Sequence, residues 1–309
     1  MEKMETPRIP GYRIERIIGK GAMSTVYLAV QESLERRVAL KVLTPKLAAD
    51  PTFHKRFIKE GRIIAKLGHP HIVTIFDTGN CHDIYYIAME YLEAGTLKER
   101  IKAGLTPEQA ANILCQVAQA LDYAHRQNCI HRDIKPANIL FRNQEMAVLS
   151  DFGIAKNLED KTQLTAVGWR LGTPNYMSPE QALGKPVDSR CDLYSLGVVF
   201  YEMLTGTRPY QGADAFEIAL MHVKEPIPTL PDPLRRFQPV IERLLAKNPE
   251  ARFPSGEELA QVVRSPVLVP GAARSAWRQA QPWILAALLA GLAALLTYSF
   301  WPATPVTPP

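Results

Sequence analysis

The segment HRDIKPANIL (residues 131–140) decides how the rest of the chain is interpreted. It sets the acid Asp133 between two bases, and Asn138 follows five residues later, directly before an apolar pair. An aspartate can orient a hydroxyl nucleophile and accept its proton, whereas asparagine and aspartate oxygens can hold magnesium between phosphates. A polar surface turn is the competing interpretation of a single acid. The spacing therefore predicts an active site if matching groups occur elsewhere in the chain.

Two matching groups follow closely. The sequence DFG at 151–153 adds a second acid, Asp151, as a candidate magnesium ligand. Lys135 adds a cation two residues after Asp133, where it can stabilise a phosphoryl group during transfer. With Asn138, these side chains predict the catalytic and metal-binding part of a phosphoryl-transfer site.

A glycine-rich stretch near the N-terminus predicts the phosphate-binding part. IGKGAMSTVYLAV (18–30) places Gly19 and Gly21 between two expected strands, with Ser24 in place of a third glycine. Glycines let the backbone close over phosphates without side-chain obstruction. The following segment reads as a strand and not a helix, so the pattern differs from a dinucleotide-binding fingerprint. A flexible hairpin is the alternative interpretation.

The next candidate is a lysine with an acidic partner. In VALKVL (38–43), Ala39 and Lys41 share one strand face, which leaves room for a flat base beside a cation. Glu60 lies in the apolar stripe of the following helical segment. That stripe consists of Phe53, Phe57, Ile64 and Leu67. A carboxylate in an inward-facing stripe needs a cation, and Lys41 is the obvious candidate.

Residues 12–264 resemble the protein kinase superfamily, and most closely the eukaryotic-like Ser/Thr kinases of bacteria. The resemblance is carried by an ordered set of motifs: GKGAMSTV, VALK, Glu60, HRDIKPAN, DFGIAK, GTPNYMSPEQ, CDLYSLGVVFYEMLTG and NPEARFPS. It implies an α+β, two-lobed protein kinase fold, with a small β-rich N-lobe and a larger helical C-lobe. The implied reaction is transfer of the γ-phosphoryl group of ATP to protein Ser/Thr hydroxyls, with magnesium and with manganese as a possible substitute.

The resemblance also implies roles for individual residues. Asp133 would be the base, Lys135 would stabilise the transferred phosphate, and Thr173 would help to position the substrate. Asn138 and Asp151 would bind the metal. Lys41 would bind the α/β-phosphates, and Glu60 would hold Lys41 in place. Met89 would be the gatekeeper, and the backbone of the hinge at 90–92 would form hydrogen bonds with adenine. The ATP-contacting set would also include Ile18, Gly19, Lys20, Gly21, Ala22, Val26, Ala39, Glu90, Leu92 and Leu140.

Structural and regulatory roles follow from the same resemblance. Asp192 would anchor the catalytic loop, and Glu180 would pair with Arg252. Arg132, directly before Asp133, is typical of kinases whose activation loop is ordered by phosphorylation. The acceptors would be Thr162 and Thr165, between which the sequence does not choose; two solvated loop threonines are the alternative. Ser178 replaces the usual alanine before Pro179, a small-for-small change.

The hydrophobic pattern agrees with two lobes. Residues 12–91 read as strands with one helix among them, including strand-like runs at 71–79 and 83–91. From residue 96 the period becomes helical, and Thr106, Pro107 and Gln109 form a capping-box start. Further helices are expected at 187–206, 215–225, 234–247 and 255–264.

The composition argues against several other classes. The net charge of +5 is mild and dispersed, without a long Lys/Arg run, so no nucleic-acid partner is expected. The N-terminus lacks the apolar core of a signal peptide. The cysteines lack zinc spacing and are expected to be buried thiols in a reducing compartment. They are Cys81, Cys115, Cys129 and Cys191.

The C-terminal part predicts a membrane anchor. PWILAALLAGLAALLTYSFW (282–301) is almost wholly apolar, and such a helix spans roughly 30 Å. Arginines precede it, so the positive-inside rule predicts a single-pass protein of the inner (plasma) membrane with a cytoplasmic kinase domain. Residues 1–11 would be an extension, 12–264 the kinase domain, 265–281 a juxtamembrane linker and 302–309 a short extracytoplasmic tail. A buried core helix is the alternative interpretation of 282–301.

Three questions stay open at this level. Ala287 and Gly291, four residues apart, permit close helix packing and hence a homodimer in the membrane. A pseudokinase scaffold and a kinase of small molecules are the competing functions. The intact catalytic set argues against the scaffold, and GTPNYMSPEQ, which resembles a protein-substrate platform, argues against a small-molecule kinase. The sequence names neither the protein substrate nor the activating signal.

Overall fold

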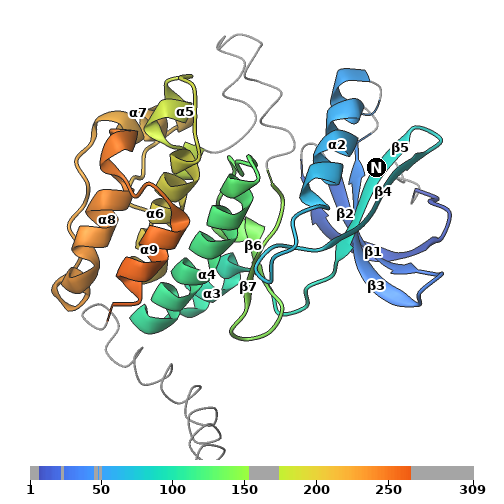
Figure 1. Ribbon diagram of the computed structural model, residues 1–309, viewed down its shortest axis with the longest axis horizontal. Coiled ribbons are helices and arrows are strands. Elements are labelled where there is room, and N and C mark those ends of the chain that lie inside the picture. The colour runs from blue at the N-terminus through green and yellow to red at the C-terminus, as the bar shows by residue number, and fades with distance from the viewer. Residues whose placement is uncertain (1–6, 22–23, 45–47, 49–50, 153–173, 266–309) are drawn as a thin grey trace, which may run out of the picture. The chain divides into compact units, whose positions relative to one another are not determined.

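The computed structural model describes residues 7–21, 24–44, 48, 51–152 and 174–265, with the side chains of 51–53, 55, 56 and 60 left out. The chain divides into two units, Met1–Val263 and Arg264–Pro309, and nearly all described residues belong to the first. Within that unit a strand-rich N-lobe precedes a helical C-lobe (Figure 1). The two-lobed kinase fold expected from the sequence is therefore confirmed.

The N-lobe is built on a five-stranded antiparallel sheet with the order β1-β2-β3-β5-β4. Its strands are β1 (Tyr12–Lys20), β2 (Ser24–Gln31), β3 (Arg36–Leu43), β4 (Ile75–Cys81) and β5 (Ile84–Glu90). The helix α2 (Pro51–Ile64) packs against β4 and β5. Strand β3 lies inside the sheet between β2 and β5, which places Lys41 opposite Ile87.

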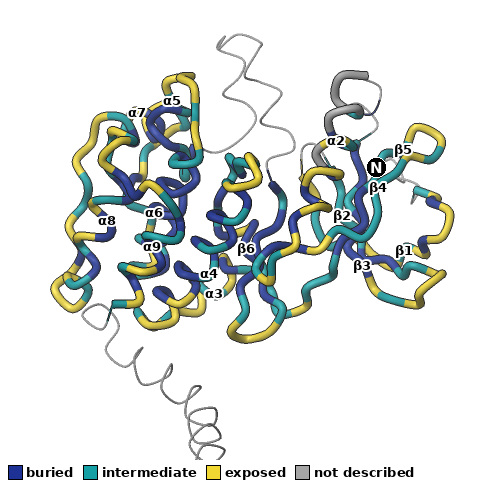
Figure 2. The backbone as a smooth tube through the Cα atoms, viewed as in Figure 1, coloured by how far each residue is buried: buried dark blue, intermediate teal, exposed yellow. Residues whose placement is uncertain are grey.

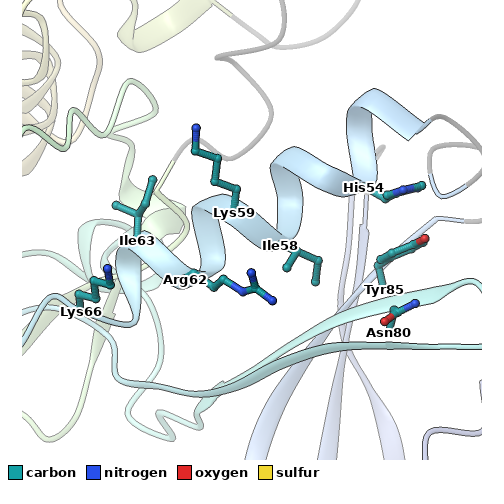
Figure 3. Close-up of a pocket in the computed structure, with 8 residues that line it drawn as sticks. All are labelled: His54, Ile58, Lys59, Arg62, Ile63, Lys66, Asn80 and Tyr85. Carbon is teal, nitrogen blue, oxygen red and sulfur yellow. The ribbon is translucent and has the colours of Figure 1, made fainter.

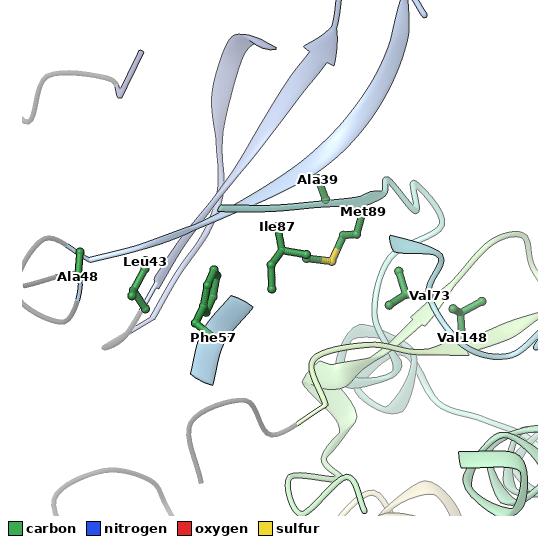
Figure 4. Close-up of a cluster of buried hydrophobic side chains, with 8 residues drawn as sticks. All are labelled: Ala39, Leu43, Ala48, Phe57, Val73, Ile87, Met89 and Val148. Carbon is green, nitrogen blue, oxygen red and sulfur yellow. The ribbon is translucent and has the colours of Figure 1, made fainter. Parts of the chain in front are cut away.

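The two faces of β3 enter different apolar clusters, as alternation of side chains requires. Val38, Leu40 and Val42 pack on one face with residues of β1, β2 and β5. Ala39 and Leu43 pack on the other face with Phe57 of α2 and with Met89 (Figure 4). Val148 of the C-lobe joins this second cluster, so the face that carries Ala39 and Lys41 is the one directed toward the C-lobe.

The C-lobe consists of helices with one two-stranded sheet. Its helices are α3 (Leu97–Ala103), α4 (Pro107–Arg126), α5 (Pro179–Ala182), α6 (Arg190–Thr205), α7 (Ala215–Lys224), α8 (Gln238–Leu244) and α9 (Gly256–Val263). Strands β6 (Ile139–Phe141) and β7 (Ala147–Leu149) pair antiparallel. Helix α6 is buried along most of its length (Figure 2), and it confirms the helix expected at 187–206.

Among the described helices, three begin with a capping box. The predicted one is confirmed: Thr106 Oγ1 accepts from Gln109 N at 3.2 Å, and Thr106 N donates to Gln109 Oε1 at 2.9 Å. Thr96 caps α3 and Ser178 caps α5 in the same way. The Ser178 hydroxyl thus does what an alanine could not, and such a cap stabilises a helix by about 1 kcal/mol.

Some predicted elements are shifted or shorter. The helix expected at 234–247 is a 3₁₀ turn (Asp232–Phe237) followed by α8, because Pro239 has no N–H to donate and fits only the first turn of a helix. The strand expected at 71–79 begins only at Ile75. The prediction of buried thiols is correct for Cys115 and Cys191 but wrong for Cys81, at the end of β4, and Cys129, after α4, which are both half-buried.

The predicted membrane anchor lies outside the described residues. Across the described parts of 7–265, none of the helices combines the length and the apolar character that crossing a bilayer requires. The segment 282–301, its linker and its tail begin beyond that range, so membrane anchoring and the packing of Ala287 and Gly291 stay predictions.

Candidate active site

The side chains of the HRDIKPANIL segment converge on one carboxylate. Lys135 Nζ donates to Asp133 Oδ2 at 2.6 Å, and Asn138 Nδ2 donates to the same oxygen at 3.1 Å. Asn138 Nδ2 also donates to the backbone carbonyl of Asp133 at 2.8 Å. Three of the predicted catalytic residues are therefore brought together, and the loop fixes the direction of the Asp133 carboxylate.

A buried aspartate of α6 anchors the backbone of this loop. Asp192 accepts hydrogen bonds from the backbone N–H groups of His131 and Arg132, at 2.8 and 2.7 Å, and from His125 Nε2 at 2.8 Å. Burial is the largest single influence and would raise the pKa of Asp192, but the hydrogen bonds and charges around it, the His125 bond first among them, together hold the pKa below its usual value. Arg132 takes a positive φ of 63°, an uncommon conformation that these bonds stabilise.

His131 is a loop-organising residue to which the sequence reasoning gave no role. Its Nε2 lies 2.9 Å from the carbonyl of Ser150, and its Nδ1 accepts from the backbone N–H of Asp133 at 3.2 Å. A carbonyl only accepts, so the proton is on Nε2 and the ring is neutral. Burial lowers the pKa of His131 in agreement with that state. The histidine of the HRD motif was the sequence signal that could have indicated this role.

The lysine predicted to bind phosphates contacts the candidate metal ligand. Lys41 Nζ lies 2.7 Å from Asp151 Oδ1, which joins β3 to the start of the DFG motif. Burial is the largest single influence and would raise the pKa of Asp151, but the neighbouring cations, Lys41 foremost, together hold the pKa below the usual value. The side chain of Glu60 is outside those described, so its pairing with Lys41 stays a prediction.

The residues present fit a magnesium ion. Magnesium prefers oxygen ligands, and Asp151 offers an ionised carboxylate. The amide nitrogen of Asn138 donates hydrogen bonds to Asp133, so the amide oxygen of Asn138 is directed away from that carboxylate. The two predicted metal ligands thus present oxygens, while a lysine for the phosphates lies beside one of them.

The residues predicted to line the adenine site belong to one apolar cluster. Ala39 and Met89 are buried in it, opposite one another on β3 and β5, and Ile18, Val26 and Leu92 pack against it. The predicted Gly-rich cover is the β1–β2 connection, in which Gly21 N donates to Ser24 O at 2.9 Å. Gly19 pairs with Val26 and Lys20 with Thr25 along these strands, Leu140 lies in β6, and Ala22 lies outside the described residues.

A second feature that the sequence reasoning missed secures the hinge. Arg142 Nε and Nη2 donate to Glu90 Oε1 and Oε2 at 2.7 and 2.8 Å, and Arg142 Nη1 donates to the carbonyl of Pro70 at 2.9 Å. The hydrogen bonds from Arg142 lower the pKa of Glu90. One arginine of the C-lobe thereby ties the end of β5 to the segment before β4.

The structural pair predicted from the sequence is formed. Arg252 Nη1 and Nη2 bind Glu180 Oε1 and Oε2 at 2.7 and 2.8 Å, and both side chains are almost fully buried. Three predicted residues, Thr162, Thr165 and Thr173, lie outside the described residues. The predicted pairing of Arg132 with a phosphothreonine is likewise untested.

A groove of about 500 Å³ lies apart from these groups, between α2 and the β4–β5 hairpin (Figure 3). Its lining residues are His54, Ile58, Lys59, Arg62, Ile63, Lys66, Asn80 and Tyr85. The rings of His54 and Tyr85 stack at 4.3 Å between centroids. Among the described residues, the groove contains none of the predicted catalytic or ATP-contacting side chains.

Fold and site together define a protein kinase, and comparison with known proteins agrees. The family model described as protein kinase domain matches residues 12–267, so the chain belongs to that family.

Individual relatives refine the comparison. Serine/threonine-protein kinase PknB of Mycobacterium leprae is 41% identical over 268 residues, which cover 82% of this chain and 42% of that protein. Serine/threonine-protein kinase PrkC of Bacillus subtilis is 41% identical over 265 residues, covering 84% and 41%. The crystal structure of the Mycobacterium tuberculosis PknI kinase domain matches with a TM-score of 0.67 at 31% identity, covering 84% of this chain and 96% of that one. The chain thus spans less than half the length of the curated relatives.

Proposed function

We propose that this chain is an ATP- and magnesium-dependent serine/threonine protein kinase. The observation that carries the proposal is the arrangement around Asp133, whose carboxylate is held by Lys135 and Asn138. PknB and PrkC, named above, are serine/threonine-protein kinases, and their alignments cover 82% and 84% of this chain. Manganese is a possible substitute for magnesium.

The proposed chemistry assigns each group a step. Asp133 orients a serine or threonine hydroxyl and accepts its proton as the hydroxyl oxygen attacks the γ-phosphorus; the bond from that phosphorus to the β–γ bridging oxygen breaks, and ADP leaves. Lys135 stabilises negative charge on the phosphoryl group during transfer. Lys41 holds the α/β-phosphates, and Asn138 and Asp151 hold the metal. When bound, magnesium supplies neutralisation of charge on the phosphate oxygens.

The test is phosphoryl transfer from labelled ATP with magnesium, comparing the full chain with its Asp133→Asn variant. Asparagine keeps the size of the side chain but cannot accept the proton, so transfer should fall at least about a hundredfold. Retained ATP binding in the variant shows that the fold survives. Equal transfer by both proteins, or ATP binding without transfer by either, would contradict the proposal and favour a scaffold.

We also propose that autophosphorylation of Thr162 or Thr165 activates the kinase. The support is Arg132, which stands directly before Asp133, and the presence of both threonines between Asp151 and Glu180. Replacing both by alanine should lower turnover and remove label from this segment in mass spectrometry. Unchanged turnover would contradict the proposal.

A membrane anchor at 282–301 is the remaining proposal from the sequence, with the kinase domain in the cytoplasm. Its support is an apolar stretch long enough to span a bilayer, preceded by Arg274 and Arg278. The full chain should sediment with membranes after a high-salt wash, whereas a chain ending at residue 265 should not. Homodimerisation through Ala287 and Gly291 should then appear as a cross-linked species that Gly291→Leu abolishes.

A further inference from the structure

The short turn Pro174–Tyr176 directly follows Thr173, within the motif that resembles a protein-substrate platform. Side chains of two helices, α6 and α7, form hydrogen bonds with its backbone. Ser195 Oγ of α6 donates to the carbonyl of Tyr176 at 2.6 Å. His222 Nε2 of α7 lies 3.2 Å from the carbonyl of Asn175. Consecutive carbonyls of the turn are therefore bound by side chains of two different helices.

The position of His222 is fixed by its second nitrogen. Tyr194 Oη lies 2.9 Å from His222 Nδ1, and the two rings meet edge to face with centroids 5.7 Å apart. Both side chains are fully buried. Because Tyr194 belongs to α6, the imidazole of α7 is oriented by the central helix of the lobe.

The hydrogen bonds define the protonation state of this ring. The carbonyl of Asn175 can only accept, so Nε2 carries the proton, and Nδ1 accepts from the Tyr194 hydroxyl. Lys247 reinforces the neutral state, since its Nζ lies 2.8 Å from the carbonyl of His222 itself and 2.9 Å from Tyr210 Oη. A neutral histidine that makes a hydrogen bond with each ring nitrogen is a rigid link from α6 to the turn.

The same turn is coupled to the catalytic loop. It leads directly into α5, where Gln181 Nε2 donates to the carbonyl of Arg132 at 3.2 Å. Arg132 precedes Asp133, so the backbone that follows Thr173 and the backbone that carries the base are joined through one short helix. A displacement of the turn would change where a bound protein substrate lies relative to Asp133.

We propose that His222 is a positioning residue for the protein substrate, whose Nε2–H holds the Asn175 carbonyl and so fixes the platform beside Asp133. The inference rests on the proposed kinase function. It requires no contact between His222 and the substrate, because the histidine acts through the backbone of Asn175.

Two substitutions separate this role from simple packing. The amide nitrogen of glutamine reaches about as far as Nε2, so His222→Gln keeps a donor for Asn175. The amide oxygen of asparagine reaches only as far as Nδ1, so His222→Asn keeps the bond with Tyr194 and loses the one with Asn175. Tyr210→Phe is the matched control, because it removes a hydroxyl from the same buried cluster without touching the turn.

The assay uses the full chain in mild detergent, with the full-length Asp133→Asn chain as the protein substrate. His222→Asn should raise the KM for this protein substrate about tenfold, the effect of losing one buried hydrogen bond, while the KM for ATP stays unchanged. His222→Gln and Tyr210→Phe should both stay within about twofold of the unmodified chain. Equal KM values for the asparagine and glutamine variants, or a shared fall in kcat that follows their Tm, would overturn the inference.

A second measurement is independent of catalysis. Hydrogen exchange of the backbone amides of residues 175–178 should be faster in His222→Asn than in His222→Gln. Unchanged exchange in the asparagine variant would overturn the role of His222, even if ATP supports no transfer. Absence of transfer by the unmodified chain would instead count against the kinase function alone.

Discussion

Lys41 Nζ and Asp151 Oδ1 lie 2.7 Å apart, so the lysine of the N-lobe that is predicted to bind phosphates directly contacts the candidate metal ligand at the C-lobe side of the site. Residues that are 110 positions apart in the sequence are thereby joined by one ion pair. Lys41 would bind the phosphates of a metal–nucleotide complex, and Asp151 would bind its metal ion. The site is therefore complete only when both lobes contribute.

Replacing Lys41 by methionine should abolish most of the phosphoryl transfer, because methionine keeps the apolar stem but removes the cation for the phosphates. We expect a loss of at least about a hundredfold in kcat/KM, measured with labelled ATP. Lys66→Met is the control, since this exposed lysine lies in the separate groove and should leave transfer unchanged. A Lys41→Met variant with transfer within tenfold of the unmodified chain would place the phosphates elsewhere.

The Glu180–Arg252 pair should matter for stability. Removing one member of a buried ion pair leaves the other charge uncompensated, so Arg252→Met should lower the free energy of unfolding by about 3–5 kcal/mol. Urea denaturation measures this change. The double variant Glu180→Gln/Arg252→Met should recover part of the loss, because no charge is then left unpaired. Arg235→Met, which breaks an exposed pair with Asp232, should change stability by less than about 1 kcal/mol.

If Arg252→Met and Arg235→Met were equally mild, the buried pair would contribute no more than a surface pair. That result would also mean that the hydrogen bonds from Arg252 to the carbonyls of Ala246, Arg190 and Lys247 add little to the free energy of unfolding.

The Arg142–Glu90 contact predicts an effect on ATP affinity. Arg142→Met frees the end of β5, whose backbone would bond adenine, while leaving all residues of the catalytic loop in place. The KM for ATP should rise about fivefold, the effect of losing roughly 1 kcal/mol, with kcat unchanged in steady-state kinetics. Arg37→Met is a matched control, because Arg37 pairs with Glu93 near the same hinge but at an exposed position. Equal KM values for the two variants would contradict the prediction.

Much of the site was predictable because its chemistry demands particular residue types at particular spacings. Asp133, Lys135 and Asn138 are local to one segment, so their convergence follows from a single loop. The alternation of β3 likewise placed Ala39 and Lys41 on one face without knowledge of the tertiary structure. Local capping signals at Thr96 and Ser178 were available in the sequence, since both have Glu or Gln three residues later.

The remaining contacts depend on how distant elements meet. Glu90 and Arg142 are 52 residues apart, and neither belongs to a local pattern that indicates a partner. His222 lies 47 residues after Asn175 on an apolar helix, where a histidine reads equally well as a filler of the core. Such pairs are set by the packing of α6, α7 and the loop after β6, for which sequence spacing carries no signal.

The buried state of His222 gives stability a pH dependence with a definite sign. Burial and the nearby Lys247 lower the pKa of His222 from 6.5 to about 4, and its remaining neighbours, Tyr194 and Tyr210, are neutral. The unfolded chain therefore binds the proton first, so stability is present above pH 6.5 and is lost as the pH falls toward 4. Between pH 6.5 and pH 5, His222 should account for a loss of roughly 2 kcal/mol in the free energy of unfolding. The His222→Gln variant should lack this part of the slope in urea denaturation, and parallel curves would contradict the assignment.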